Sequence, residues 1–114
     1  LGQAFLGLKK GARAIEAFQK ALELNPESLS ANINLGITYL NLGYIDDSIV
    51  IFDNVLKRFP KIAGVHKNLG MIYYQYKKNS IKAIKHFKES LKLDHNQPEA
   101  MQIRLIIEEL ENLN

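Results

Sequence analysis

Residues 29–60 read LSANINLGITYLNLGYIDDSIVIFDNVLKRFP, and this stretch predicts two helices joined by a tight turn. In its first half, Leu35, Tyr39 and Leu42 fall at i, i+4 and i+7, which is the spacing of one helical face. Gly43 follows directly, and glycine readily adopts the left-handed conformation that ends a helix. We therefore expect a first helix that closes at this glycine.

The second half of the stretch begins at residue 45, and its apolar residues form another helical stripe, at Ile45, Ile49, Phe52, Val55 and Leu56. Acidic residues lie in its first turn and basic residues in its last, where the helix dipole favours each sign, at Asp46, Asp47, Lys57 and Arg58. Pro60 disfavours helical backbone at Phe59 and stops the helix. The predicted unit is helix, turn, helix, stop.

This unit recurs with a period of 34 residues. Leu-Gly pairs begin at positions 1, 35 and 69, aromatic residues follow at positions 5, 39 and 73, and prolines stand at positions 26 and 60. A period of this length indicates an array of supersecondary units that lean on their neighbours. The repeated glycine is informative, because glycine costs a helix roughly 1 kcal/mol relative to alanine. We expect Gly36 to let a partner helix approach closely, opposite small residues such as Ala14 and Ser48.

The repeated residues resemble the tetratricopeptide repeat family, whose pattern is Leu-Gly, Tyr, Ala, Phe, Ala and Pro at fixed offsets. The second repeat shows Leu35, Gly36, Tyr39, Ser48, Phe52, Val55 and Pro60. The first shows Leu1, Gly2, Phe5, Ala14, Phe18, Ala21 and Pro26. The third shows Leu69, Gly70 and Tyr73 and then, one residue late, Ala83, Phe87 and Ser90. The family's large aromatic residue near each repeat start is replaced by Asn32 and His66.

This resemblance implies an all-α, right-handed solenoid of about three helical hairpins with a C-terminal capping helix. The expected layout is a partial repeat at 1–28, full repeats at 29–62 and 63–97, and the capping helix at 98–112. The third repeat carries a one-residue insertion in its turn. In the partial repeat we expect two helices, a short one over residues 1–7 and a second from about 11 to 24, with more chain upstream.

The capping helix is expected to end the array. Its register places Arg104 and Glu108 where an internal repeat would have Leu and Tyr, and Glu111 continues the same stripe. A polar outer face keeps the last repeat of such an array soluble.

In tetratricopeptide arrays the first helices line a concave groove, so the resemblance implies a non-catalytic interaction module that holds a peptide or helical segment. Asn34 and Asn68 are 34 residues apart, where some such arrays use asparagine against a peptide backbone. An asparagine side chain offers both a donor and an acceptor, although asparagine can also simply be common at this position. The groove positions implied by register are Gln3, Ile33, Asn34, Ile37, Asn41, Lys67, Asn68, Met71, Tyr74 and Gln75.

Two alternatives remain open. Charge is banded along the chain, with +9 over residues 57–92 against a total of +3, so this band could dock electrostatically to nucleic acid or an anionic membrane. Nucleic-acid binding is disfavoured, because the lysine stripe at Lys82, Lys85, Lys88 and Lys92 contains no arginine or aromatic residue for stacking. The repeats could also regulate an enzyme domain upstream. The family's clamp for C-terminal carboxylates is absent, since Gly64 and Asn68 stand where cations are required.

Catalytic, metal and cofactor sites are not expected. The chain has no cysteine, and no nucleophile, phosphate-loop or paired-carboxylate motif is visible. The three histidines appear isolated in the sequence, and we expect one of them to replace a buried aromatic residue. Neither a membrane-spanning run nor a signal peptide is visible. We expect a soluble chain whose compartment is not assigned by the sequence, with the cytoplasm favoured. We also expect a protein or peptide partner, and a monomer unless upstream repeats mediate assembly.

Overall fold

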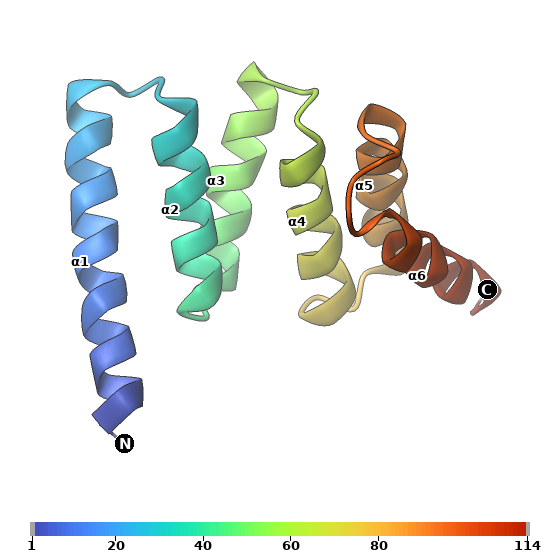
Figure 1. The fold of residues 1–114 in the computed structure, drawn as a ribbon, viewed down its shortest axis with the longest axis horizontal. Helices are drawn as coiled ribbons and strands as arrows, with labels where there is room; N and C mark the ends of the chain where they lie inside the picture. The colour runs from blue at the N-terminus through green and yellow to red at the C-terminus, as the bar shows by residue number, and fades with distance from the viewer. Residues whose placement is uncertain (1, 114) are drawn as a thin grey trace. The chain divides into compact units, whose positions relative to one another are not determined.

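The computed structural model describes the backbone of residues 2–113 and the side chains of residues 9–113. All regular structure in this part of the chain is helical (Figure 1), in six elements: α1 Gly2–Leu24, α2 Leu29–Asn41, α3 Ile45–Arg58, α4 Ala63–Gln75, α5 Ser80–Leu93 and α6 Ala100–Asn112. The helices fall into two compact units that divide between Arg58 and Phe59, the first with α1 to α3 and the second with α4 to α6. Each unit contains one helical hairpin, α2–α3 or α4–α5.

The α2–α3 hairpin confirms the helices predicted from residues 29–60. Ser28 caps α2, because its side-chain oxygen accepts a hydrogen bond from the backbone N–H of Ala31 at 3.2 Å. Gly43 adopts the left-handed conformation, with φ of 86°, in the turn that follows α2. The helix α3 begins with its acidic residues and ends with its basic ones, as the dipole argument requires.

The core of this hairpin is built around Gly36. A Cβ atom at Gly36 would lie 2.7 Å from Cε1 of Phe52, whose ring is fully buried. The expected close approach is therefore confirmed, although its partner is the Phe52 ring. Ser48, also fully buried, donates a hydrogen bond from its hydroxyl to the Gly36 carbonyl oxygen at 2.8 Å, which ties α3 to α2.

The α4–α5 hairpin repeats this packing, because a Cβ atom at Gly70 would lie 2.6 Å from Cδ1 of the buried Phe87. Its helices have the same lengths as α2 and α3, but four residues separate them where three separate α2 from α3. Lys78, in this longer turn, has a positive φ of 51°. Asn79 then caps α5, since its side-chain oxygen accepts from the backbone N–H of Lys82 at 3.1 Å.

The expectation of two helices in the first repeat is wrong. α1 is continuous over Gly2–Leu24, so the turn expected between residues 7 and 11 is absent. Gly11 lies inside the helix rather than at its start, and a Cβ atom there would meet the side chain of Leu42 at 2.5 Å. The segment contains no proline, and Leu8, Lys9 and Lys10 between its two glycines have good helix propensity, so the glycines weaken the helix without breaking it.

The helix α6 packs against α5 in the second unit and buries an apolar stripe at Ile103, Ile106, Ile107 and Leu110. It begins at Ala100, two residues after the expected Pro98. Arg104 and Glu108 are exposed, as predicted, but Met101 and Leu105 are also 73% and 61% exposed. The expected polar outer face is therefore only partly polar.

Candidate functional site

The predicted groove residues of the second unit form one stripe along α4, at Lys67, Asn68, Met71, Tyr74 and Gln75. All five are partly or fully exposed. Two of them contact the C-terminal part of the unit: the Lys67 ammonium lies 3.3 Å from a carboxylate oxygen of Glu99, and the Tyr74 hydroxyl donates to Glu109 Oε2 at 3.2 Å. The stripe on α4 thus faces residues at and within α6.

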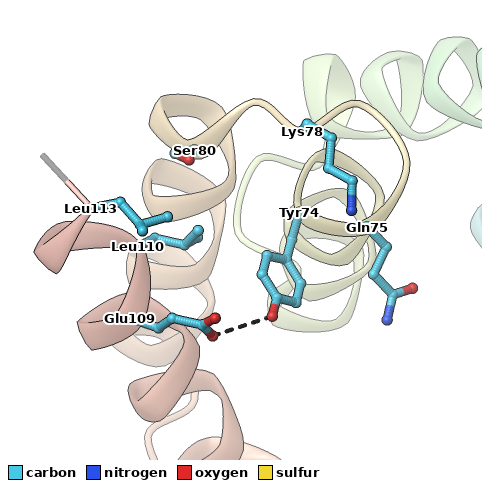
Figure 2. Close-up of a pocket in the computed structure, with 7 residues that line it drawn as sticks. All are labelled: Tyr74, Gln75, Lys78, Ser80, Glu109, Leu110 and Leu113. Atoms are coloured by element: carbon cyan, nitrogen blue, oxygen red, sulfur yellow. Dashed lines mark hydrogen bonds between the residues drawn. The ribbon is translucent and has the colours of Figure 1, made fainter.

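A pocket of about 600 Å³ lies at the C-terminal end of this stripe. Figure 2 shows its lining, which comes from α4, the α4–α5 turn, the first residue of α5, and the C-terminal part of α6: Tyr74, Gln75, Lys78, Ser80, Glu109, Leu110 and Leu113. Tyr74 and Gln75 were predicted from register. The other five were missed. Lys78 and Ser80 lie after α4, outside the register of the predicted groove, and no sequence pattern shows that α6 brings Glu109, Leu110 and Leu113 to the end of α4.

The polar groups of the pocket differ in whether they already have hydrogen-bond partners within the protein. Tyr74 and Glu109 bond each other, and the negative charge of Glu109, together with burial and this hydrogen bond, raises the pKa of the Tyr74 phenol above its usual value. Gln75, Lys78 and Ser80 make no side-chain hydrogen bond or ion pair with any described residue. The pocket therefore offers an amide, an ammonium group and a hydroxyl beside an apolar floor formed by Leu110 and Leu113.

At the edge of the same stripe, the Glu99 carboxylate is held in its charged form. A backbone hydrogen bond within Glu99, followed by the hydrogen bond and charge of Lys67, lowers the pKa of this carboxyl group. The ion pair leaves Lys67 engaged with a partner inside its own unit. Lys67 is therefore less free to meet a ligand than its position in the register suggests.

In the first unit, the predicted groove residues of α2 also form one stripe, at Ile33, Asn34, Ile37 and Asn41. Asn34 and Asn41 are exposed, and Ile33 and Ile37 are partly exposed. The Asn34 amide makes only a long contact of 3.5 Å to the Ser30 hydroxyl, so it can bind another group. Gln3 belongs to α1, but its side chain lies outside the described residues.

The expectation of three isolated histidines is wrong. His66 on α4 is buried, as expected for a residue in an aromatic position, but its Nδ1 atom lies 3.1 Å from Nδ1 of His86 on α5. His86 also stacks on Tyr73, with ring centroids 5.8 Å apart. Sequence spacing missed this pair because the two residues meet only across the helical hairpin. The described residues contain no group of three histidine, aspartate or glutamate side chains placed to hold a metal ion.

The lysine stripe of the basic band lies exposed on α5, at Lys82, Lys85, Lys88 and Lys92. Two of its members already have partners within the unit. Lys88 pairs with Glu111 at 3.3 Å, and the Lys82 ammonium lies 5.2 Å from the Tyr73 ring centroid. Lysine side chains on a solvated helix face typically make such contacts with neighbouring residues of their own unit.

None of the described helices is both long enough and apolar enough to cross a membrane.

Comparison with known proteins identifies one family. A family model described as "Tetratricopeptide repeat" matches residues 5–69. The anaphase-promoting complex subunit CDC16 of Saccharomyces cerevisiae is 34% identical over 107 residues, which cover 88% of this chain and 13% of that protein. The chain thus spans a small part of that relative.

Solved structures share the fold, among them two that contain a bound peptide. The Yersinia enterocolitica type III secretion chaperone SycD, in complex with a peptide of the translocator YopD, has a TM-score of 0.81 at 18% identity and covers 98% of this chain and 89% of its own. The first TPR of Spaghetti (RPAP3), bound to an HSP90 peptide, has a TM-score of 0.78 at 19% identity and covers 96% of this chain and 87% of its own. At these identities the likeness concerns the fold alone.

Proposed function

Because the chain belongs to the tetratricopeptide repeat family and shares its all-α solenoid fold, we propose that it is a non-catalytic module that binds a peptide or helical segment of another protein. The observation that carries this proposal is the pocket of about 600 Å³ beside α4, which includes two residues of the predicted groove, Tyr74 and Gln75. The SycD and Spaghetti structures each contain a bound peptide, which supports the same class of function.

The pocket suits one apolar side chain of a bound segment. Ligand sites in proteins are mostly apolar with a few polar groups that fix orientation, and this pocket combines both. Leu110, Leu113 and the Tyr74 ring supply the apolar part, while the side chains of Gln75 and Lys78 have no partner among the described residues. We infer that these two side chains hydrogen-bond to the backbone of the segment.

The first helix of each hairpin contributes one asparagine of the predicted groove to this proposal. Asn34 on α2 is exposed and Asn68 on α4 is partly exposed, and each side chain can both donate to and accept from an extended backbone. Met71, one turn after Asn68 on α4, is partly exposed and can adapt to different apolar partners. The remaining predicted groove positions belong to the same proposal.

A selected peptide tests the proposal directly. A random peptide library displayed on phage is selected against the immobilised chain, and the recovered peptide is titrated by fluorescence anisotropy. Asn34→Ala with Asn68→Ala should weaken its binding by roughly tenfold, because each lost hydrogen bond contributes about 0.5–1.5 kcal/mol. Asn54→Ala, an exposed asparagine on α3, is the matched control and should leave binding unchanged.

The pocket is tested with the same peptide. Leu110 is buried, so its replacement would disturb the fold, whereas Tyr74→Ala and Lys78→Ala alter the lining at partly exposed and exposed positions. Both should weaken binding while the far-UV circular dichroism stays unchanged. Equal affinity of the peptide for the parent, the asparagine double variant and the two pocket variants would refute groove binding.

A further inference from the structure

His66 joins three segments of the second unit. Its Nε2 atom lies 2.9 Å from the carbonyl oxygen of Pro60, in the segment before α4, and its Nδ1 atom lies 3.1 Å from Nδ1 of His86 on α5. His66 is buried and His86 is half-buried. The imidazole of His66 therefore connects the start of the unit to both helices of its hairpin.

The other hairpin shows what this arrangement replaces. Asn32 occupies the position that corresponds to His66, and its amide donates to the Pro26 carbonyl oxygen at 3.4 Å and to the Ser28 carbonyl oxygen at 2.9 Å. The position that corresponds to His86, with the one-residue offset of the longer turn, is Ile51. The first hairpin thus contacts the carbonyl oxygen of its preceding proline through an amide, which does not titrate. The second hairpin makes this contact through an imidazole that is paired with a second imidazole.

The hydrogen bonds fix where the protons lie. A carbonyl oxygen can only accept, so Nε2 of His66 carries the proton that it donates to Pro60. In the neutral ring Nδ1 of His66 is then the acceptor, and Nδ1–H of His86 is the donor. This pairing requires a neutral His66 ring, because its Nδ1 must keep the lone pair that accepts from His86. If both rings were protonated, two N–H groups would face each other across 3.1 Å.

The surroundings disfavour a positive charge on His86. From α4, His86 meets His66 and the Tyr73 ring, and from α5 it is influenced by Lys82 and Lys85. The segment before α4 contributes the Pro60 carbonyl to His66, and no carboxylate among the described residues contributes to the pKa shift of His86. Burial, then His66, Lys85 and Lys82, lowers the pKa of the His86 imidazole from 6.5 to about 4. An imidazolium beside Tyr73 would also meet the Lys82 ammonium already placed over that ring.

We propose that the His66–His86 pair is an acid-sensitive latch, which holds the α4–α5 hairpin closed when both rings are neutral and releases it when they take up protons. The first unit has no counterpart, because all three histidines of the chain lie after residue 58. Mild acid therefore loosens the second unit selectively.

The direction and size of the effect follow from proton linkage. His86 binds a proton more weakly in the folded hairpin than in the open chain, so the latch contributes its full stability above pH 6.5 and loses it as the pH falls towards 4. With these two pKa values, the opening equilibrium constant of the hairpin is about 20-fold higher at pH 5 than at pH 7.

The latch also bears on binding, and this part rests on the function proposed above. The pocket takes Tyr74 and Gln75 from α4, Lys78 from the turn and Ser80 from α5, so it needs the closed hairpin. Acid should then weaken a peptide bound at the pocket. A peptide that binds equally well at pH 5 and pH 7 while the hairpin opens would contradict the proposed binding site and leave the latch intact.

Native-state hydrogen exchange tests the latch itself, with protection factors compared at pH 7 and pH 5 after intrinsic rates are divided out. Amides of α4 and α5 should lose about 20-fold in protection in the parent chain. The variant His66→Asn with His86→Ile, which copies Asn32 and Ile51 of the other hairpin, should lose less than twofold. An equal loss in parent and variant would overturn the proposal.

A second measurement is independent of whether that variant folds. The imidazole resonances of His86 are followed by NMR in the parent chain from pH 8 to pH 3.5, with the exposed His95 as a reference within the same molecule. Titration of His86 with a pKa near 4, together with loss of hairpin amide signals as it protonates, supports the latch. Titration near 6.5 without loss of those signals would refute it.

Discussion

Alanine at Gly64 and at Gly70 should have opposite effects on stability, although both glycines lie in α4. Gly64 is exposed, and a Cβ atom added there would meet nothing within 4 Å. Gly70 is buried, and its added Cβ would lie 2.6 and 2.7 Å from Cδ1 and Cε1 of Phe87. Real Cβ contacts are not this short, and the fully buried Phe87 ring must therefore move.

The expected changes in the free energy of unfolding differ between the two substitutions. Alanine gains up to about 1 kcal/mol over glycine in a helix, and Gly64, in the first turn, should gain about 0.5 kcal/mol. At Gly70 the same gain is opposed by overpacking, which costs about 1–3 kcal/mol in a close-packed core. The Gly70→Ala chain should therefore be destabilised by up to about 2 kcal/mol, and the two variants should differ by about 0.5–2.5 kcal/mol.

Urea unfolding followed by far-UV circular dichroism measures this difference. With a slope of about 1–3 kcal/mol per molar urea, the two midpoints should lie about 1 M apart. Phe87→Leu in the Gly70→Ala background should recover part of the loss, because a smaller side chain relieves the contact. If Gly70→Ala unfolded at the same midpoint as Gly64→Ala, the close approach of α4 and α5 would be wrong.

Three further outcomes are expected. Asn79→Ala should destabilise the chain by about 1 kcal/mol in the same urea assay, because it removes the N-cap of α5, and no change would show that the cap is not stabilising. Arg104→Leu with Glu108→Tyr should add to the apolar surface already exposed on α6 and produce concentration-dependent association by sedimentation, so a monomeric variant of a monomeric parent would contradict the capping role. Glu109→Gln should lower the pKa of the Tyr74 phenol, which is read from ultraviolet absorbance between pH 9 and pH 12. Because the pKa is raised in the folded chain, the Tyr74–Glu109 contact stabilises the folded state below pH 10, and this stabilisation is lost above it. An unchanged titration would refute the contact.

Much of the fold could be predicted from the sequence, because the determinants of each hairpin are local. The helix α2 and the start of α3 follow the predicted bounds, Gly43 closes the first of these helices in the left-handed conformation, and the glycine at position 36 packs closely in the core. Helical spacing, turn glycines and stop prolines act within a few residues, so they can be recognised in one dimension. The exception was α1, where a repeat pattern predicted a turn that the backbone does not make.

The candidate site was likewise predictable only where its residues lie on one helix. Register along the chain placed Asn68, Tyr74 and Gln75 on one exposed stripe of α4, since helical periodicity fixes which residues share a face. Only the tertiary structure brought Glu109 to Tyr74 and His86 to His66, pairs separated by 35 and 20 residues. Such contacts depend on how one helix packs on another, and no local pattern encodes that packing. The period of 34 residues therefore determined the repeating unit, whereas the packing of α6 and of the hairpin helices determined the pocket and the histidine pair.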